Sequence, residues 1–303
     1  MVMTKGAGML RILVIALALV SLHTGIAPAA PVMHVDDSAN NLGKVDVATG
    51  TVSVIGNMGN ATMTDIAFNP AGQLFGISFT GFYSINPTTA AATFIGNHSV
   101  PGGNALVFAA DGTLYAAGFS STSLFTINPA TGAGTSLGNI SAASGGDLAF
   151  NGGELFLATT SSQLFHINLA NLAASAAVGS FGVSNVFGLA TGDNGVLYAV
   201  AGTNVYTVDT ATGAATNPVD FGGHGLFSAN GQSFFTESGA PVPTPVPEPA
   251  TLLLLGSSLT AAGLAAWRRR RPPPSAGPCP TAPCAPRART CSRRAAGCAG
   301  RAG

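Results

Sequence analysis

A phrase of six residues recurs five times along the middle of the chain, at almost constant spacing. Each copy opens with an apolar residue and Asp or Asn and closes in or near Thr-Gly. The copies lie at Val45–Gly50, Ile85–Ala90, Ile127–Gly132, Ile167–Leu172 and Val208–Gly213. Successive copies begin 40, 42, 40 and 41 residues apart. A regular period of this length predicts a fold assembled from repeated supersecondary units.

A second phrase keeps the same period and supplies the apolar part of each unit. It joins a run such as Ile66–Phe68 to a glycine and a further apolar pair such as Leu74–Phe75, and a weaker copy runs from Leu226 to Phe235. Short alternating or apolar runs separated by Asn-Pro, Asp-Gly or Thr-Gly are typical of antiparallel strands joined by hairpins. We therefore expect about four strands in each unit.

Four strands in every forty residues predict an all-β fold, a β-propeller of about five four-stranded blades. Four units are complete between Thr64 and Phe221. Val32–Asn57 contains only the later strands of a unit, and Gly223–Glu237 only the earlier ones, so together they would complete a fifth blade. The phrase resembles the propeller repeats of secreted bacterial proteins but lacks the Trp-Asp dipeptide of WD40 repeats. A solenoid or an irregular β-sandwich is the alternative.

Charge divides the chain sharply. Between Ala30 and Pro247 the only basic residue is Lys44, against eleven acids, which gives a net charge of 1 − 11 = −10. An acidic domain repels phosphate backbones, so we do not expect a nucleic-acid partner. No cysteine precedes Cys279, so the repeat domain, placed at residues 30–238, has no disulfide and depends on its apolar core.

The first 29 residues predict a signal peptide. Lys5 and Arg11 form its basic region, Ile12–Leu22 its apolar core and Ala27–Ala29 its cleavage site. Met1 and Met9 are both possible starts, because Arg11 precedes the apolar run in either case. Export across the inner membrane follows from this segment.

The region after the repeats predicts a second segment that interacts with the membrane. Five prolines between residues 239 and 249 predict an extended stalk, since proline fixes φ and removes a backbone donor. Residues 250–267 are uncharged and just long enough for one short transmembrane helix. Arg268–Arg271 would then remain on the cytoplasmic side, so the repeat domain would face outward.

Within residues 246–271, Val246, Pro247, Glu248 and Pro249, the apolar segment and Arg268, Arg269, Arg270 and Arg271 follow one another in a specific order. This order resembles the PEP-CTERM sorting signal of Gram-negative bacteria. The resemblance implies an exosortase-type membrane protease as a partner, transient anchoring in the inner membrane, and final placement at the cell surface or in the extracellular matrix. It also implies an association with exopolysaccharide. An ordinary tail anchor after a Pro-rich linker is the alternative.

Residues 272–303 depart from the pattern of that family, whose signal normally ends shortly after the arginines. Their composition shifts to Pro, Ala, Arg and Cys, and they contain all four cysteines of the chain. We interpret them as a frame-shifted or over-extended reading frame, with a basic low-complexity tail as the alternative. The cysteine spacing does not match a zinc site.

No motif for nucleophilic, zinc-dependent or phosphate-binding chemistry occurs in the sequence. Loops that enter the inner strands of a propeller contribute Asp65, Asn104, Asp147 and His224, which could form a shallow patch for a sugar or for Ca²⁺. Alternatively, Asp65 and Asp147 satisfy backbone amides of turns. The Asp or Asn that recurs in every copy of the first phrase is expected to cap a hairpin.

These observations predict a non-enzymatic protein without a metal or cofactor, Ca²⁺ excepted, that serves a structural or ligand-binding role at the cell envelope. A polysaccharide hydrolase or lyase is the alternative. It would need two or three carboxylates or histidines to converge at the channel mouth. Asp65, Asp147 and His224 within about 8 Å of one another around a cavity would favour it.

Overall fold

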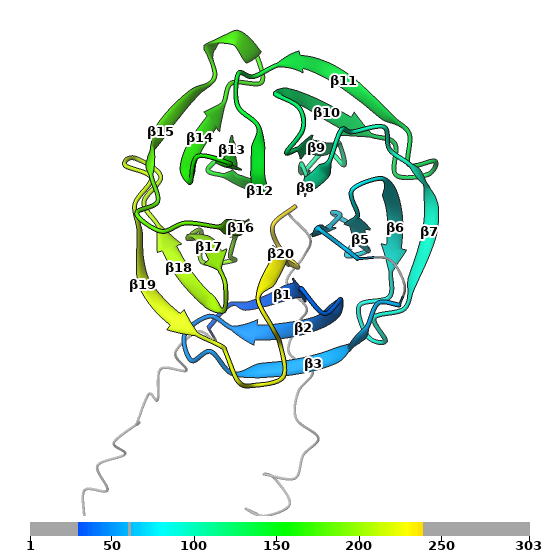
Figure 1. Ribbon diagram of the computed structural model, residues 1–303, viewed down its shortest axis with the longest axis vertical. Helices are drawn as coiled ribbons and strands as arrows, with labels where there is room; N and C mark the ends of the chain where they lie inside the picture. The colour runs from blue at the N-terminus through cyan, green and yellow to red at the C-terminus, as the bar shows by residue number, and fades with distance from the viewer. Residues whose placement is uncertain (1–29, 60–61, 239–303) are drawn as a thin grey trace, which may run out of the picture. The chain divides into compact units, whose positions relative to one another are not determined.

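Five four-stranded antiparallel sheets are arranged in a ring around a central axis, as Figure 1 shows for the computed structural model of the chain. The structure describes residues 30–59 and 62–238. The all-β, five-bladed propeller expected from the repeat is confirmed, and the solenoid and the sandwich are excluded because the ring closes.

We number the blades along the ring, starting with the one that joins both ends of the repeat domain. Blade 1 consists of β20 (Ala229–Phe234), β1 (Val32–Asp37), β2 (Asn41–Asp46) and β3 (Val52–Asn57). Blade 2 consists of β4 (Asp65–Phe68), β5 (Leu74–Ile77), β6 (Gly81–Ile85) and β7 (Ala92–Asn97). Blade 3 consists of β8 (Gly103–Phe108), β9 (Leu114–Gly118), β10 (Ser123–Ile127) and β11 (Gly134–Asn139).

Blades 4 and 5 complete the ring. Blade 4 consists of β12 (Ser144–Asn151), β13 (Glu154–Thr159), β14 (Gln163–Ile167) and β15 (Ala176–Ser180), with a 3-10 turn, η1 (Leu172–Ala174), before its outer strand. Blade 5 consists of β16 (Val186–Thr191), β17 (Leu197–Ala201), β18 (Asn204–Val208) and β19 (Ala215–Asp220).

Blade 1 closes the ring by pairing the two ends of the repeat domain, as expected from its split halves. β20 lies antiparallel to β1, with Met33 opposite Phe234 and Val35 opposite Gln232. The Asp37 carboxylate reinforces the closure, because Oδ2 accepts a hydrogen bond from the backbone N–H of Phe227, 190 residues away. An apolar strand pair and a charge-assisted hydrogen bond thus hold segments from opposite ends of the domain.

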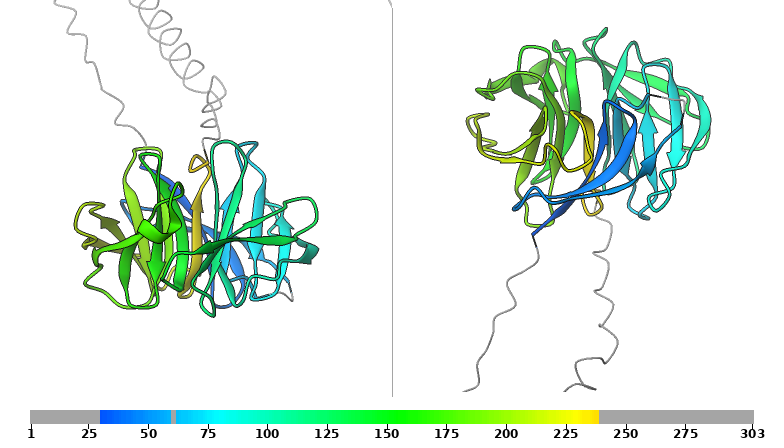
Figure 2. Two further views of the ribbon diagram at one scale, coloured as in Figure 1. Left: turned by 90° about the horizontal axis from the view of Figure 1, so that it is seen from above. Right: turned by 60° about the horizontal axis from the view of Figure 1, so that its bottom comes forward.

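Burial falls from the axis to the rim within each blade. The inner strands β4 and β8 are buried at every residue, whereas the outer strands β3 and β7 alternate between half-buried and exposed residues. The edge-on views of Figure 2 show the strands of a blade standing side by side. This gradient explains why the inner strands are short apolar runs and the outer strands are rich in polar residues.

The core lies between the blades, in five apolar clusters, one at each blade interface. Between blades 2 and 3, for example, Phe75 stacks on Phe82 at a centroid distance of 5.5 Å and contacts Phe108 at 5.4 Å. Each fully buried large apolar side chain stabilises the fold by about 2 kcal/mol. Every blade therefore depends on both neighbours, and no blade buries its faces alone.

The first repeated phrase forms the turn between the third and the outer strand of each blade. At this position Oδ1 of the Asp or Asn accepts backbone N–H bonds from the residues that follow, in all five blades: Asp46, Asn86, Asn128, Asn168 and Asp209. The expected hairpin caps are confirmed. They recur because the turn geometry is the same in every blade.

Several expectations concern residues outside the described part of the chain: the signal peptide, the stalk, residues 250–267 and the basic tail. Among residues 30–59 and 62–238, no helix is both long and apolar enough to cross a membrane. The short transmembrane helix therefore stays a prediction.

Candidate functional site

A cavity of about 420 Å³ opens on the axis at the end of the ring where the inner strands begin. Its floor and walls come from the starts of those strands, and its rim from the turns between the second and third strands of blades 2, 3 and 4. Its lining comprises Thr62, Thr64, Phe79, Asn104, Phe119, Ser144, Gly145, Gly146, Thr159, Thr160, Ser162, Asn185, Val186, Phe187 and Asn230. We call it the axial cavity.

Three exposed phenylalanines supply the apolar part of the axial cavity. Phe79 is 52% exposed, Phe119 48% and Phe187 38%, and the rings of Phe79 and Phe119 meet edge to face at 5.4 Å. Large aromatic side chains exposed around a hollow are typical of ligand-binding surfaces.

The polar part of the axial cavity consists of hydroxyl and amide groups. Asn104 is buried, and its Nδ2 lies 3.5 Å from the carbonyl of Ser144, while its Oδ1 has no hydrogen-bond partner among the described residues. None of the acidic, basic or histidine side chains among residues 30–59 and 62–238 lines the cavity. The arrangement can bind an uncharged ligand through hydrogen bonds and aromatic contacts but offers it no general acid or base.

Asp65 and Asp147 lie beneath this surface, fully buried, in β4 and β12. Oδ1 of each accepts the N–H of the next residue, Ile66 or Leu148, at 2.7 and 2.6 Å. Oδ2 reaches across to the next blade, where Asp65 accepts from Leu106 at 2.6 Å and Asp147 from Leu189 at 2.7 Å. The two carboxyls therefore tie blade 2 to blade 3 and blade 4 to blade 5.

The two side chains also influence each other's ionisation across the axis. Burial, followed by the charge of Asp147, raises the pKa of Asp65 well above its usual range. Burial likewise raises the pKa of Asp147. Both shifts oppose ionisation of the two carboxyls in the folded protein.

Two further acids surround the axis. Asp36 in β1 is fully buried, neither of its oxygens has a hydrogen-bond partner among the described residues, and burial raises its pKa to about 7. Glu237 accepts a bond from Ser233 Oγ at 3.1 Å, and burial, then the charge of Asp147, raises its pKa well above the usual range. None of the four axial acids lines the axial cavity.

Of the four ligand residues predicted from the sequence, the structure places only Asn104 on the axial cavity. Asp65 and Asp147 lie near each other but are buried. They accept hydrogen bonds from backbone amides, as the alternative interpretation predicted, but these amides belong to strands and not to turns. His224 is exposed in the turn after β19, near Asp220. Within residues 30–59 and 62–238, no group of three or more Asp, Glu, His or Cys is arranged to hold a metal ion.

The sequence interpretation missed the rim of the axial cavity. Phe79 and Phe119 occupy the same position of the repeat, two residues after Ile77 and Ala117, which hold equivalent places in β5 and β9. A signal was present, since a large apolar residue next to turn residues in two successive units contradicts a purely polar loop.

Residues 245–271 match the PEP-CTERM protein-sorting motif. The chain carries a PEP-CTERM sorting signal. The motif covers the four residues of the signature, the apolar segment and the four arginines, so this part of the sequence prediction is confirmed. It indicates an exported protein of a Gram-negative bacterium that is transiently anchored in the membrane and processed by exosortase. No match was found among curated protein sequences.

Solved structures similar to the chain include a symmetrical protein from a study of de novo evolutionary emergence, at 22% identity over 65% of this chain and 96% of that one, with a TM-score of 0.46. A chain of a nidogen/laminin complex matches at 13% identity over 68% and 85%, with a TM-score of 0.47. A gluconolactonase from Xanthomonas campestris matches at 16% identity over 64% and 77%, with a TM-score of 0.45.

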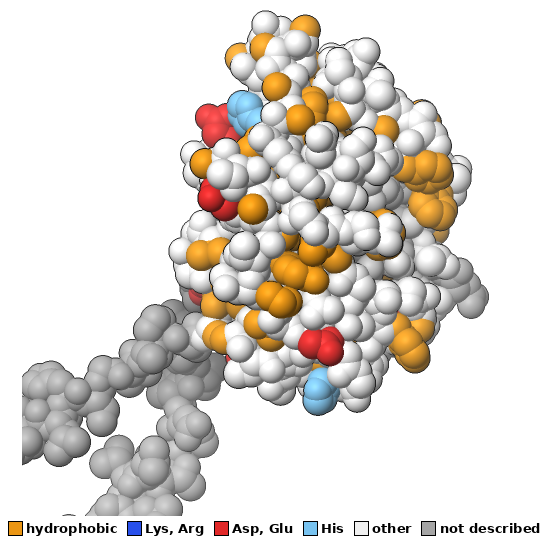
Figure 3. Space-filling model, turned by 60° about the vertical axis from the view of Figure 1, so that its left-hand side comes forward, with side chains coloured by type: hydrophobic (Ala, Val, Ile, Leu, Met, Phe, Trp, Pro, Cys, Tyr) orange, Lys and Arg blue, Asp and Glu red, His pale blue; other side chains and the backbone are white. Residues whose placement is uncertain are grey.

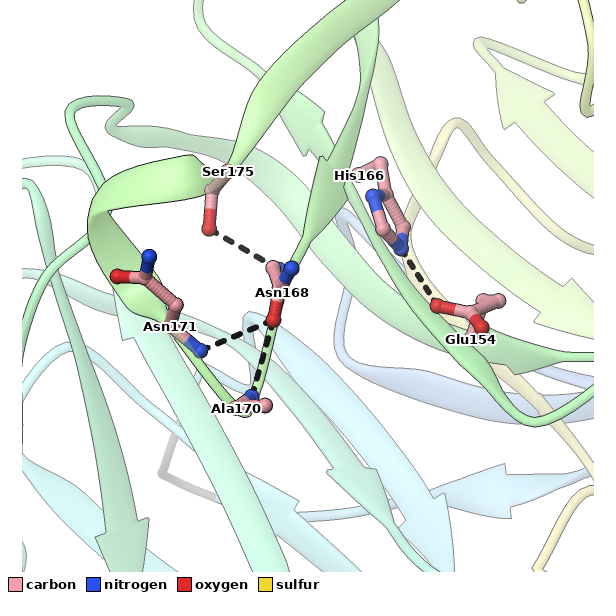
Figure 4. Close-up of polar contacts among 6 residues, drawn as sticks. All are labelled: Glu154, His166, Asn168, Ala170, Asn171 and Ser175. Carbon is pink, nitrogen blue, oxygen red and sulfur yellow. Dashed lines mark hydrogen bonds and ion pairs between the residues drawn. The ribbon is translucent and has the colours of Figure 1, made fainter.

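The face of the propeller drawn in Figure 3 is mostly uncharged. On the face drawn in Figure 3, scattered acidic and histidine side chains lie among neutral atoms, and no lysine or arginine is visible. Figure 4 shows the Glu154–His166 pair, 2.6 Å apart on blade 4, beside the hairpin cap of Asn168. His166 thus has a surface partner and no contact with the axial cavity.

Proposed function

We propose that this protein is a non-enzymatic, exported propeller that binds an uncharged stretch of extracellular polysaccharide in the axial cavity. One observation carries the proposal: the cavity combines a phenylalanine rim with Ser, Thr and Asn side chains and contains no titratable group. The rings suit the apolar faces of sugars, and hydroxyl and amide groups both donate and accept hydrogen bonds.

The size and charge of the domain agree with this ligand. A volume of about 420 Å³ lies within the usual range for small-molecule sites, roughly 300–1,000 Å³. The net charge of −10 between Ala30 and Pro247 repels acidic polymers, so a neutral glycan is favoured over a uronate-rich one. The PEP-CTERM signal indicates export, which supports a ligand located outside the cytoplasm.

A hydrolase or lyase is less well supported, because catalysis of this kind needs carboxyl groups that reach the substrate. Asp65 and Asp147 are fully buried and each accepts two backbone N–H bonds, while His224 lies on an exposed turn. We therefore propose a binding role, with exosortase as the processing partner and the cell surface or matrix as the final location.

The test is a glycan array probed with the full-length protein, followed by affinity measurements on neutral glycans that bind. We expect Phe79→Ala to weaken binding at least about tenfold, because a central aromatic contact contributes about 1.5 kcal/mol or more. Phe94→Ala is the matched control, since Phe94 on β7 is 55% exposed and Phe79 is 52% exposed, but Phe94 does not line the axial cavity.

Two results would refute the proposal. One is the absence of any glycan that binds above the level of the Phe79→Ala variant. The other is equal loss of binding in Phe79→Ala and Phe94→Ala, which would place the ligand elsewhere on the propeller.

A further inference from the structure

One row of residues across blade 1 breaks the repeat. Ser233 in β20, His34 in β1 and Lys44 in β2 are direct cross-strand neighbours. The same row in the other blades is a small apolar residue, an aromatic ring and a short polar or histidine side chain. Those rows are Ala67–Phe75–Ser84, Val107–Tyr115–Thr126, Ala149–Phe156–His166 and Ala190–Tyr198–Thr207.

Four blades adopt the propeller architecture without these polar residues. The architecture therefore does not require them in blade 1. The row in blade 1 replaces a buried aromatic ring by an imidazole and places an ammonium group beside it. His34 lies edge to face with Phe68 at 4.8 Å, so it still fills the volume of the missing ring. Packing alone does not explain the change to polar groups.

His34 and Lys44 line a second pocket, distinct from the axial cavity, with a volume of about 540 Å³. Its lining comes from blades 1 and 2, from the turn of blade 5 that contains Asp193, and from the first described residues of the chain. Its lining is mainly apolar and comprises Ala30, Pro31, Val32, His34, Lys44, Phe68, Pro87, Thr88, Asp193, Phe234, Phe235 and Thr236. We call it the closure pocket, and Figure 1 shows β20, β1 and β2, which form one of its walls.

Lys44 is the only basic residue between Ala30 and Pro247, and it is exposed. Among the described residues its ammonium group forms no ion pair, although Asp193 lines the same pocket. Lys44 is thus an unpaired cation in a domain with eleven acids. Its ammonium group is available to an anionic ligand.

His34 supplies a second polar feature. It is only 6% exposed, and its Nδ1 has no hydrogen-bond partner among the described residues. Burial, followed by the charge of Lys44, lowers its pKa to about 3. The ring is therefore neutral at ordinary pH and offers one donor and one acceptor without adding charge.

We propose that the closure pocket binds a small carboxylate with an apolar or aromatic body. The carboxylate lies at Lys44, and the body packs on Phe68 and Phe235, whose rings meet at 5.2 Å. Asp193 in the lining and the acidic domain limit the ligand to one negative charge, because a polyanion would be repelled. The site is independent of the axial cavity and of the glycan proposed there.

The test is calorimetric titration of the full-length protein with phenylacetate and with 2-phenylethanol, which has a similar body without the charge. We expect phenylacetate to bind with a Kd on the order of 1 mM or tighter, as its small size allows. Lys44→Gln should weaken phenylacetate binding by about fivefold or more and leave 2-phenylethanol unchanged, because a partly exposed ion pair contributes about 1 kcal/mol.

Two control variants separate charge from packing. Lys44→Arg keeps the charge and should retain phenylacetate binding to within about twofold, the effect of altered geometry alone. Phe235→Ala removes apolar surface and should weaken both ligands alike. The proposal is overturned if phenylacetate does not bind, if it binds no better than 2-phenylethanol, or if Lys44→Gln binds it as well as the wild type.

Discussion

Blade 1 and the other four blades share one architecture but differ in what they bury. In blades 2 to 5, the second strand buries Ile77, Ala117, Ala158 and Val200 at one position. In blade 1 the equivalent residue is Asp36, which is also fully buried and has no hydrogen-bond partner among the described residues. Four blades therefore follow the repeat in their cores, and the blade that closes the ring does not.

The difference teaches that the repeated architecture explains the features that all blades share but not the polar groups confined to blade 1. Features present in every blade, such as the capped hairpins, are explained by the geometry of the propeller. Buried polar groups confined to one blade, such as Asp36 and His34, carry a cost in stability that the architecture does not require. Three experiments test this division.

The largest effect is expected at the rim, where a glycine of one outer strand meets the hairpin of the next blade. A Cβ added at Gly179 in β15 would lie 2.0 Å from the carbonyl oxygen of Thr212. Gly179→Ala should lower the free energy of unfolding by about 3 kcal/mol or more, because backbone must move to admit the methyl group. Urea denaturation followed by circular dichroism measures the change.

Gly56 in β3 is the matched control, since it holds the equivalent position in blade 1. A Cβ there would lie 3.0 Å from the carbonyl oxygen of Thr89, a much milder contact. Gly56→Ala should cost no more than about 1 kcal/mol. Equal losses of unfolding free energy in the two variants would show that β3 packs against its neighbouring blade as tightly as β15 does. Blade 1 would then not differ from blade 4 at the rim.

The second experiment restores the repeat in the core of blade 1. The folded-state pKa of Asp36 is about 7, above the value of 3.8 expected in the unfolded chain. Folding therefore favours the protonated acid, and its contribution to stability is lost as pH rises through 7. We expect the wild type to lose on the order of 2 kcal/mol between pH 6 and pH 9.

Asp36→Val places there the residue that blade 5 uses, Val200, and removes the titrating group. It should raise the free energy of unfolding at pH 8.5 by about 1–3 kcal/mol and flatten the loss between pH 6 and pH 8, the range that spans the folded-state pKa of about 7. The remaining slope comes from Asp65, Asp147 and Glu237, whose pKa values burial also raises, and from His34 and His98, whose pKa values burial lowers. If the pH dependence of stability is unchanged in Asp36→Val, the loss of stability does not come from Asp36.

The smallest effect is expected at a repeated cap. In blade 3, Asn128 Oδ1 accepts the N–H of Ala130 at 2.9 Å on an exposed turn. Asn128→Ala should cost about 1 kcal/mol, the usual contribution of such a hydrogen bond. Asn128→Asp should be nearly neutral, because Asp46 and Asp209 perform the same role in blades 1 and 5. If Asn128→Asp lowers the free energy of unfolding as much as Asn128→Ala does, the side-chain oxygen is not what stabilises the turn.

Much of the fold could be predicted from the sequence, because the repeat is local and each unit contains its own turns. The spacing of Val45, Ile85, Ile127, Ile167 and Val208 gave the number of blades, and the incomplete units at both ends gave the closure. The PEP-CTERM signal was equally readable, since its residues are contiguous. In both cases the information lies within short segments of the chain.

The candidate sites could be predicted only in part. Asn104 was identified from its place before an inner strand, but Phe79, Phe119 and Phe187 come from three blades and converge only when the ring closes. Asp65 and Asp147 could be read as ligands or as structural groups, and their burial and their bonds to Leu106 and Leu189 decided the matter. Contacts between residues about 40 positions apart leave no local signal.

The sequence by itself determined the class of fold, the acidic character of the domain and the sorting signal, because period, charge and contiguous motifs do not depend on how distant segments meet. Tertiary structure alone decided which acids are buried, where the axial cavity opens, and that His34 and Lys44 line a pocket with Phe68 and Phe235. The physical reason is that burial and proximity arise between blades, and the faces of neighbouring blades are joined only when the ring is complete.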